Sequence, residues 1–107
     1  MSTRSKGNYY ALKTKKYFEA LGYQVVKAEI SKMQWIGGRT IIGHTDIWAS
    51  DLIAMNAKEI IFIQVKTHVT DVSHAKRDFD KIIWAKGVKK YIVRWELRAR
   101  EPTIVKY

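Results

Sequence analysis

The sequence predicts a single α/β domain in which a mixed β-sheet carries helices on its faces. The chain has 107 residues, a length that suits one domain spanning 1–107. Hydrophobic residues make up 47% of it and aromatic residues 12%, which is enough apolar surface to build a core and argues against disorder. Segments of helical and of β periodicity follow one another in the order helix, three strands, helix, two strands, and such mixing is typical of a sheet layered with helices.

The N-terminal quarter of the chain predicts a basic arm followed by a helix. Residues 1–7 are expected to be a mobile arm, because they contain Arg4, Lys6 and a flexible glycine. The helix is expected from Asn8, a good capping residue, to about Leu21, where Gly22 follows. Apolar residues at helical spacing form its expected buried stripe, namely Tyr10, Tyr17, Phe18 and Leu21.

The middle of the chain is expected to be mostly β-structure. Residues 23–30 are rich in β-formers and predict the first strand, and residues 31–39 predict a connection punctuated by two glycines. Residues 40–55 form a long β-prone region with expected interruptions at Gly43 and near Ala49–Ser50. The next strand is expected over residues 59–67.

The C-terminal part predicts a second helix and two further strands. The helix is expected from an Asp71 or Ser73 cap to residue 86, and the strands over residues 90–100 and 103–107. The expected inward-facing residues are Ala75, Phe79, Ile82 and Ile83 on the helix and Tyr91, Val93, Trp95 and Leu97 on the strand. Pro102 suggests that the last strand lies at an edge. The strand–helix–strand unit is expected to be a right-handed crossover with parallel strands.

Three polar residues around the strand at 60–66 predict a functional site. Side chains on a strand alternate between its faces, so Gln64 and Lys66 are expected to share a face with Phe62. A short hairpin around Asn56 would return Asp51 to the side of these two residues. An acid, an amide oxygen and an ammonium group on one face can hold a divalent metal and orient a water molecule.

A second acid, Asp46, precedes Asp51 by an odd number of residues, so the two would face opposite sides of one regular strand. Both reach one site if a bulge or bend separates them, and Ala49–Ser50 is the expected place.

The charge of the chain predicts a polyanionic partner. Twenty basic and ten acidic residues give a net charge of +10, and nucleic acid is the polyanion that small basic domains most often bind. The alternative is that the lysines serve solubility. The chain has no cysteine, which excludes disulfides and zinc–thiolate sites and fits a reducing compartment. It has no apolar run of about 20 residues, and its first residues lack the apolar core of a signal peptide. We therefore expect an intracellular, cytoplasmic protein with no membrane association.

The residues of the site resemble the PD-(D/E)xK nuclease superfamily, in particular the small archaeal and phage Holliday junction resolvase-like nucleases. Residues 51–54 (Asp-Leu-Ile-Ala) match the family's first acidic strand, and residues 63–67 (Ile-Gln-Val-Lys-Thr) match its strand with the Glu-x-Lys motif. The Lys6–Gly7 pair and the helix ending at residues 21–23 match the family's N-terminal segment. The resemblance covers nearly the whole chain and implies a restriction-endonuclease-like αβββαβ core.

The resemblance also implies metal-dependent cleavage of DNA. Asp51 would be the main ligand of Mg²⁺ or Mn²⁺, Gln64 would add a neutral oxygen, and the carbonyl of Val65 another. Lys66 would orient or help to deprotonate the attacking water and offset charge in the transition state. Two positions depart from the family pattern: Gln64 replaces an acid, and Ala11 stands where the resolvases have a glutamate. Asp46 or Glu29 would then have to supply the missing negative charge.

We therefore expect a DNA endonuclease that acts on branched or linear DNA, as a homodimer. The residues expected to contact phosphates are Arg4, Lys6, Lys13, Lys16, Lys76 and Arg77. Two alternatives stay open: a non-catalytic DNA-binding module on the same fold, and a nuclease that processes RNA.

Overall fold

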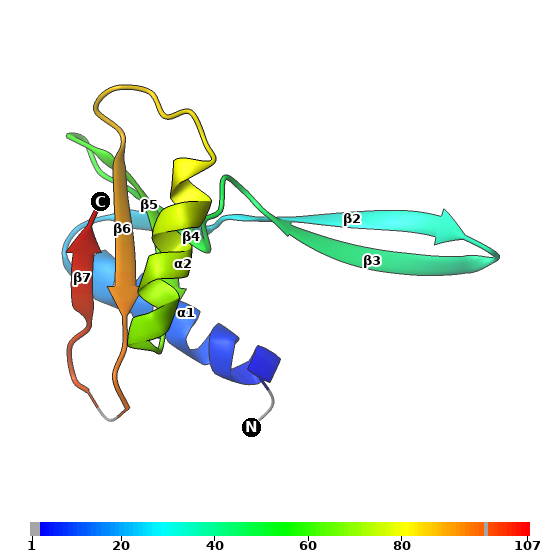
Figure 1. Cartoon of the computed structure of the whole chain (residues 1–107), viewed down its shortest axis with the longest axis horizontal. Coiled ribbons are helices and arrows are strands. Elements are labelled where there is room, and N and C mark those ends of the chain that lie inside the picture. The colour runs from blue at the N-terminus through cyan, green and yellow to red at the C-terminus, as the bar shows by residue number, and fades with distance from the viewer. Residues whose placement is uncertain (1–2, 98) are drawn as a thin grey trace.

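The protein is a mixed sheet between two helices, with a long β-ribbon that projects from it (Figure 1). The computed structural model describes the backbone of residues 3–97 and 99–107, and the side chains of residues 9–28, 37–38, 47–97 and 99–107. The described elements are, in chain order, α1 (Thr3–Ala20), β1 (Gln24–Lys27), β2 (Glu29–Ile36), β3 (Arg39–Asp46), β4 (Leu52–Met55), β5 (Ile60–Lys66), α2 (Val69–Asp80), β6 (Lys89–Arg94) and β7 (Thr103–Lys106).

The central sheet has the strand order β1-β4-β5-β6-β7. Neighbouring strands are antiparallel except β5 and β6, which are parallel and are joined through α2. The predicted parallel pair and the predicted edge position of the last strand are thus confirmed.

The alternation of side chains on β5 divides the core into two parts. Ile61 and Ile63 pack with Phe18 of α1 on one face, and Phe62 packs with Phe79 of α2 on the other. All five of these residues are buried. The sheet is therefore covered by one helix on each face, as the period-two pattern of a two-sided strand requires.

The β2–β3 ribbon is the main difference from the sequence prediction. Residues 31–39, expected to be a connection, mostly belong to β2, and β3 continues through Gly43 without a break. Gly37 and Gly38 form the turn of this antiparallel pair, with φ of 58° and 77°, a left-handed conformation that glycine adopts without steric cost. The glycines therefore mark the tip of a hairpin, and the ribbon extends far from the sheet (Figure 1).

The first helix is longer than predicted. It begins at Thr3, so residues 3–7, which were expected to be a mobile arm, have helical backbone. A glycine inside a helix costs only about 1 kcal/mol relative to alanine, so Gly7 does not prevent the helix from starting earlier. Tyr10 and Phe18 are buried as predicted, whereas Leu21 is exposed just beyond the helix.

The second helix is shorter than predicted and ends at Asp80 instead of residue 86. The carbonyl of Phe79 accepts hydrogen bonds from the backbone N–H of Ile82 (3.1 Å) and from the indole Nε1–H of Trp84 (2.9 Å). These donors satisfy a carbonyl that a further helical turn would have used, so the chain leaves the helix here. Consequently Ile83, expected to be buried, is 100% exposed.

The sixth strand is also shorter than predicted and ends at Arg94. Tyr91, Val93 and Trp95 are buried as expected, but Leu97 lies beyond the paired region and is 80% exposed. Apolar and polar residues continue to alternate beyond Arg94, but the pairing of β6 with β7 reaches only to Arg94, so the side chain of Leu97 is not buried. In the described part of the chain, no helix has the length and apolar character needed to cross a membrane.

Candidate functional site

The candidate site is built around Asp51, which directly precedes β4. Its Oδ2 accepts a hydrogen bond from the backbone N–H of Val65 (2.7 Å), and its own N–H donates to the carbonyl of Ile63 (2.8 Å). The predicted tight turn joins β4 to β5, because Asn56 Oδ1 accepts the backbone N–H groups of Lys58 and Glu59, each at 2.9 Å. The hairpin therefore brings the acid to the middle of the Gln-Val-Lys segment, as predicted.

Gln64 and Lys66 flank the N–H group that Asp51 binds, but their surroundings differ. Gln64 is only 3% exposed, and its Nε2 faces the carbonyl of Ala75 on α2 at 3.5 Å. Lys66 is half-buried at the end of β5, where its carbonyl accepts the N–H of Trp95 (2.9 Å). The structure thus places the three predicted residues side by side, with the glutamine directed under the second helix.

A four-residue bulge interrupts the chain between β3 and β4. Ile47 and Ser50 form an isolated antiparallel bridge, closed by a hydrogen bond from the N–H of Ser50 to the carbonyl of Ile47 (3.0 Å). Trp48 and Ala49 lie at its tip with φ of 48° and 55°. The irregularity predicted at Ala49–Ser50 is therefore confirmed, and its cause is a left-handed two-residue turn.

This bulge positions the backbone of Asp46, the second acid of the predicted site, relative to Asp51. Ala28 donates its N–H to the carbonyl of Asp51 (3.0 Å) and accepts the N–H of Ile47 (2.9 Å). Glu29 follows Ala28 and is the Cα partner of Asp46. The backbones of Glu29, Asp46 and Asp51 therefore meet around Ala28, at the root of the ribbon; the side chains of Glu29 and Asp46 lie outside the described residues.

Three carboxylate-bearing positions at one place suit a hard divalent cation, which takes oxygen ligands. Among the side chains that the structure describes, no three His, Cys, Asp or Glu residues form a group that would hold a metal. Asp51 contributes the described carboxylate, so a metal here would depend on Asp46 and Glu29 as further ligands.

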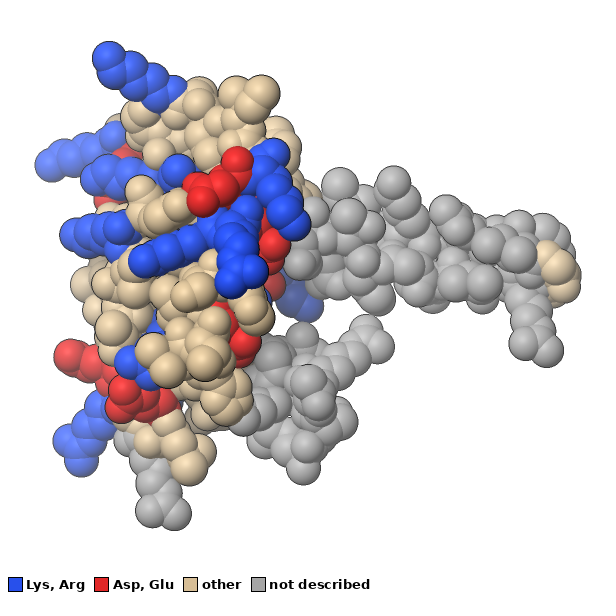
Figure 2. All heavy atoms as spheres, viewed as in Figure 1, with Lys and Arg blue, Asp and Glu red and all other residues tan. Residues whose placement is uncertain are grey.

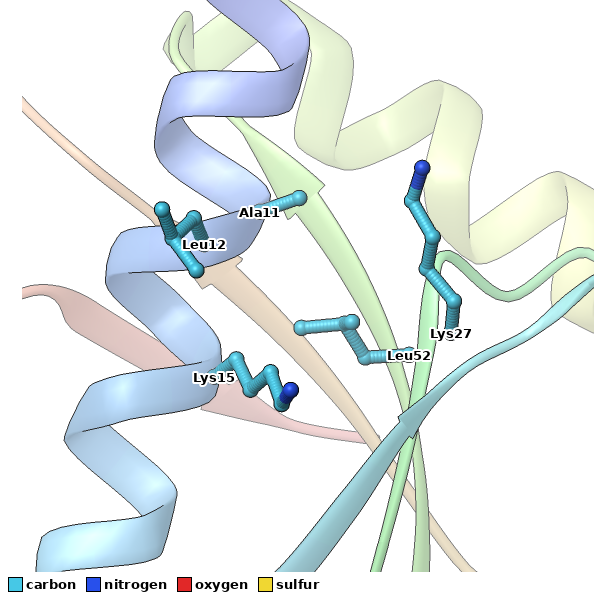
Figure 3. Close-up of a pocket in the computed structure, with 5 residues that line it drawn as sticks. All are labelled: Ala11, Leu12, Lys15, Lys27 and Leu52. Atoms are coloured by element: carbon cyan, nitrogen blue, oxygen red, sulfur yellow. The ribbon is translucent and has the colours of Figure 1, made fainter.

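A cavity of about 310 Å³ lies between α1 and the β1–β4 pair and reaches Leu52, the residue after Asp51 (Figure 3). Its lining is Ala11, Leu12, Lys15, Lys27 and Leu52. The ammonium groups of Lys15 and Lys27 stand on either side of Leu52, which is the Cα partner of Lys27. Neither lysine was identified from the sequence. No local pattern indicates the cavity, because its lining comes from α1 and from the β1–β4 pair.

Comparisons of the chain with protein-family models, with curated proteins and with solved structures find no match.

Basic side chains cover the side of the molecule formed by α2, β6 and β7, with a few acids among them (Figure 2). The Nζ atoms of Lys76 and Lys90 lie 5.8 and 5.1 Å from the centre of the Tyr107 ring. Arg77 is exposed in the last turn of α2. Of the predicted phosphate contacts, Lys76 and Arg77 thus belong to a broad basic surface.

The other predicted phosphate contacts lie on α1. Lys16 is exposed. Lys13 has a structural role, because its Nζ lies 4.5 Å from the ring centre of Trp95 and donates to the carbonyl of Ala99 (3.1 Å). The side chains of Arg4 and Lys6 lie outside the described residues.

An ionic network ties the far end of the β4–β5 hairpin to its neighbours. The carboxylate of Glu59 accepts hydrogen bonds from the hydroxyl of Tyr23 and from the ammonium of Lys89. The first bond raises the pKa of Tyr23 to about 12, and the second, with the first, lowers the pKa of Glu59. The network anchors the first residues of β5, whereas the candidate site lies at its other end.

Proposed function

We propose that this protein is a metal-dependent endonuclease that hydrolyses phosphodiester bonds in DNA. The proposal rests mainly on one observation: the carboxylate of Asp51 binds the backbone N–H between Gln64 and Lys66. This is the arrangement expected from the resemblance to the PD-(D/E)xK superfamily and its Holliday junction resolvase-like members.

The topology supports the same proposal. Leaving out the β2–β3 ribbon, the chain runs through α1, the antiparallel strands β1, β4 and β5, then α2 and the parallel strand β6. This is the αβββαβ order of a restriction-endonuclease-like core. In this interpretation the ribbon is an insertion between the first two core strands.

The chemistry divides between a cation and the residues of the chain. Mg²⁺ or Mn²⁺, held by Asp51 with Asp46 and Glu29, would neutralise charge on the phosphoryl oxygens and make bound water more acidic. Lys66 would orient the attacking water and offset the charge that develops in the transition state.

The cavity between α1 and the β1–β4 pair would hold a further phosphate of the bound nucleic acid. Lys15 and Lys27 line it with ammonium groups, which suit a phosphate. A homodimer would present two such sites to two strands.

The test is a cleavage assay on branched, flapped and linear DNA, and on RNA of the same sequence, with Mg²⁺ and with Mn²⁺. We expect the wild type to cut DNA, and Asp51→Ala and Lys66→Ala to lose cutting. Glu101→Ala and Lys58→Ala change exposed charges elsewhere and serve as matched controls. Cutting that survives both site substitutions would remove the site from the reaction, and preference for RNA would change the substrate.

One set of contacts favours a second function, a non-catalytic nucleic-acid-binding module. Gln64 is buried against α2, Asp51 supplies the described carboxylate of the site, and two lysines line the cavity between α1 and the β1–β4 pair. Such a site would bind phosphate without cutting it. Tight DNA binding, with no cleavage of any substrate in the same assay, would favour this function.

A further inference from the structure

Trp48 is an exposed aromatic residue held on a strained turn. It is 59% exposed at the tip of the bulge between Ile47 and Ser50. Its φ of 48° and that of Ala49, 55°, lie in the left-handed region, which costs free energy for residues other than glycine. Strain of this kind persists where the surrounding structure holds it, and it gathers at sites of function.

The ring of Trp48 forms one wall of an open apolar groove. Its centre lies 5.5 Å from that of Phe62 and 6.4 Å from that of Trp84, both in edge-to-face geometry. The groove has a volume of about 350 Å³, near the lower limit for small-ligand pockets, and Ile83 and Val88 also line it. It therefore offers an aromatic surface and room for one flat group.

Positive charge borders this apolar surface. Lys90 Nζ lies 5.7 Å from the ring centre of Trp84, and Lys86, two residues after Trp84, is exposed. A groove that pairs an aromatic wall with cations matches a nucleotide, whose base stacks while its phosphate meets the cations. A second copy of this chain suits the groove less well than a nucleotide, because it brings no phosphate to these cations and its own net charge is +10.

The groove is also close to the candidate site. Trp48 packs on Phe62, whereas the Asp51 carboxylate binds Val65, three residues further along β5. With a rise of about 3.3 Å per residue, the two points on the strand lie roughly 10 Å apart. One nucleic-acid strand can therefore reach both.

We propose that the groove at Trp48 stacks an unpaired nucleobase of the nucleic acid bound at Asp51. The substrate would then be a strand with unpaired nucleotides, as in a flap or a gap, and not a continuous duplex. Bases inside a duplex are already stacked on their neighbours, so only an unpaired base can enter the groove without a cost in unpairing. This inference rests on the proposed function in that it assigns nucleic acid to the same site.

The test compares binding of a flapped DNA with binding of the fully paired duplex of the same sequence. Affinities are measured by fluorescence anisotropy in EDTA, so that cleavage plays no part. We expect Trp48→Ala to weaken flap binding roughly tenfold, within the range of about 5- to 150-fold that stacking of one base contributes. Duplex binding should be unchanged. The slope of log affinity against log salt concentration should also be unchanged, because no phosphate contact is lost.

Trp48→Phe keeps an aromatic ring and should retain most of the flap preference. Tyr9→Ala removes an aromatic of similar exposure from α1 and should leave the preference intact. Thermal unfolding and circular dichroism identify any variant that fails to fold. If Trp48→Ala fails to fold, the flap and duplex affinities of Trp48→Phe are compared with those of the wild type instead.

Equal weakening on flap and duplex, or no weakening on either, would overturn the proposal. A wild-type dimer that dissociates in Trp48→Ala, with DNA affinity unchanged, would assign the groove to a second copy of the chain instead. Failure of the wild type to cut any DNA would contradict the proposed nuclease, but it would leave this binding comparison unaffected.

Discussion

Replacing Asp51 separates its structural role from its chemical role. In the wild type its carboxylate accepts the N–H of Val65 at 2.7 Å, the short length typical of a charge-assisted bond. Asp51→Ala leaves that partly buried N–H without this acceptor, which costs about 1–3 kcal/mol. Asp51→Asn still offers a carbonyl oxygen, and a neutral hydrogen bond is worth roughly half as much as a charged one, so the expected loss is about 1 kcal/mol.

Urea denaturation followed by circular dichroism measures both losses, and thermal melts check them. For a domain of about 100 residues, each kcal/mol should lower Tm by about 4–8 °C. We expect the order of stability to be wild type, then Asp51→Asn, then Asp51→Ala. If Asp51→Ala were as stable as the wild type, the bond to Val65 would contribute nothing to the fold, and the argument that it positions the acid would fail.

Three further predictions concern the core, the ionic network and the basic surface. Thr14→Val should lower the unfolding free energy by about 1–3 kcal/mol in urea titrations, because the indole N–H of buried Trp95 loses its 2.7 Å acceptor; Thr14→Ser should not, and equal losses would refute this. Glu59→Gln should bring the pKa of Tyr23 down from about 12 toward 10, measured by ultraviolet titration. Because Tyr23 ionises at higher pH in the folded protein than in the unfolded chain, the unfolding free energy of the wild type should fall between pH 10 and about 12. In Glu59→Gln this free energy should fall less steeply over the same pH range, and identical slopes for the two proteins would contradict the prediction. Lys76→Ala should flatten the salt dependence of DNA binding by about one unit, and an unchanged slope would remove that residue from the interface.

The arrangement of Asp51, Gln64 and Lys66 could be predicted because it depends on the local geometry of strands and turns. The alternation along β5 placed Gln64 and Lys66 on one face, and the turn at Asn56 returned Asp51 to them. The bulge near Ala49 followed from the odd separation of the two aspartates, which regular strand geometry cannot bring together.

Other features depend on contacts between distant segments and could not be predicted from the pattern. The end of α2 is set by the indole of Trp84 binding the carbonyl of Phe79, which the apolar spacing of Ile82 and Ile83 does not reveal. Residues 31–36 of β2 were expected to be part of a connection, because the pair Gly37–Gly38 was interpreted as a break instead of a hairpin turn.

The cavity between α1 and the β1–β4 pair was missed for the same reason. Lys15 comes from a helix and Lys27 from a strand, and the packing of α1 on the sheet makes both of them line one cavity.

The most direct test of the proposed nuclease is the single-turnover rate of DNA cleavage by the wild type and by Asp51→Asn, with saturating Mg²⁺. This variant keeps the shape of the side chain and is expected to keep the fold and DNA binding, so a change in rate reports on the lost carboxylate. We expect the rate to fall by at least about a hundredfold, because charge stabilisation by a bound metal contributes several kcal/mol and each 1.36 kcal/mol is a factor of ten. A rate within a few-fold of the wild type would show that Asp51 is not a metal ligand in the reaction.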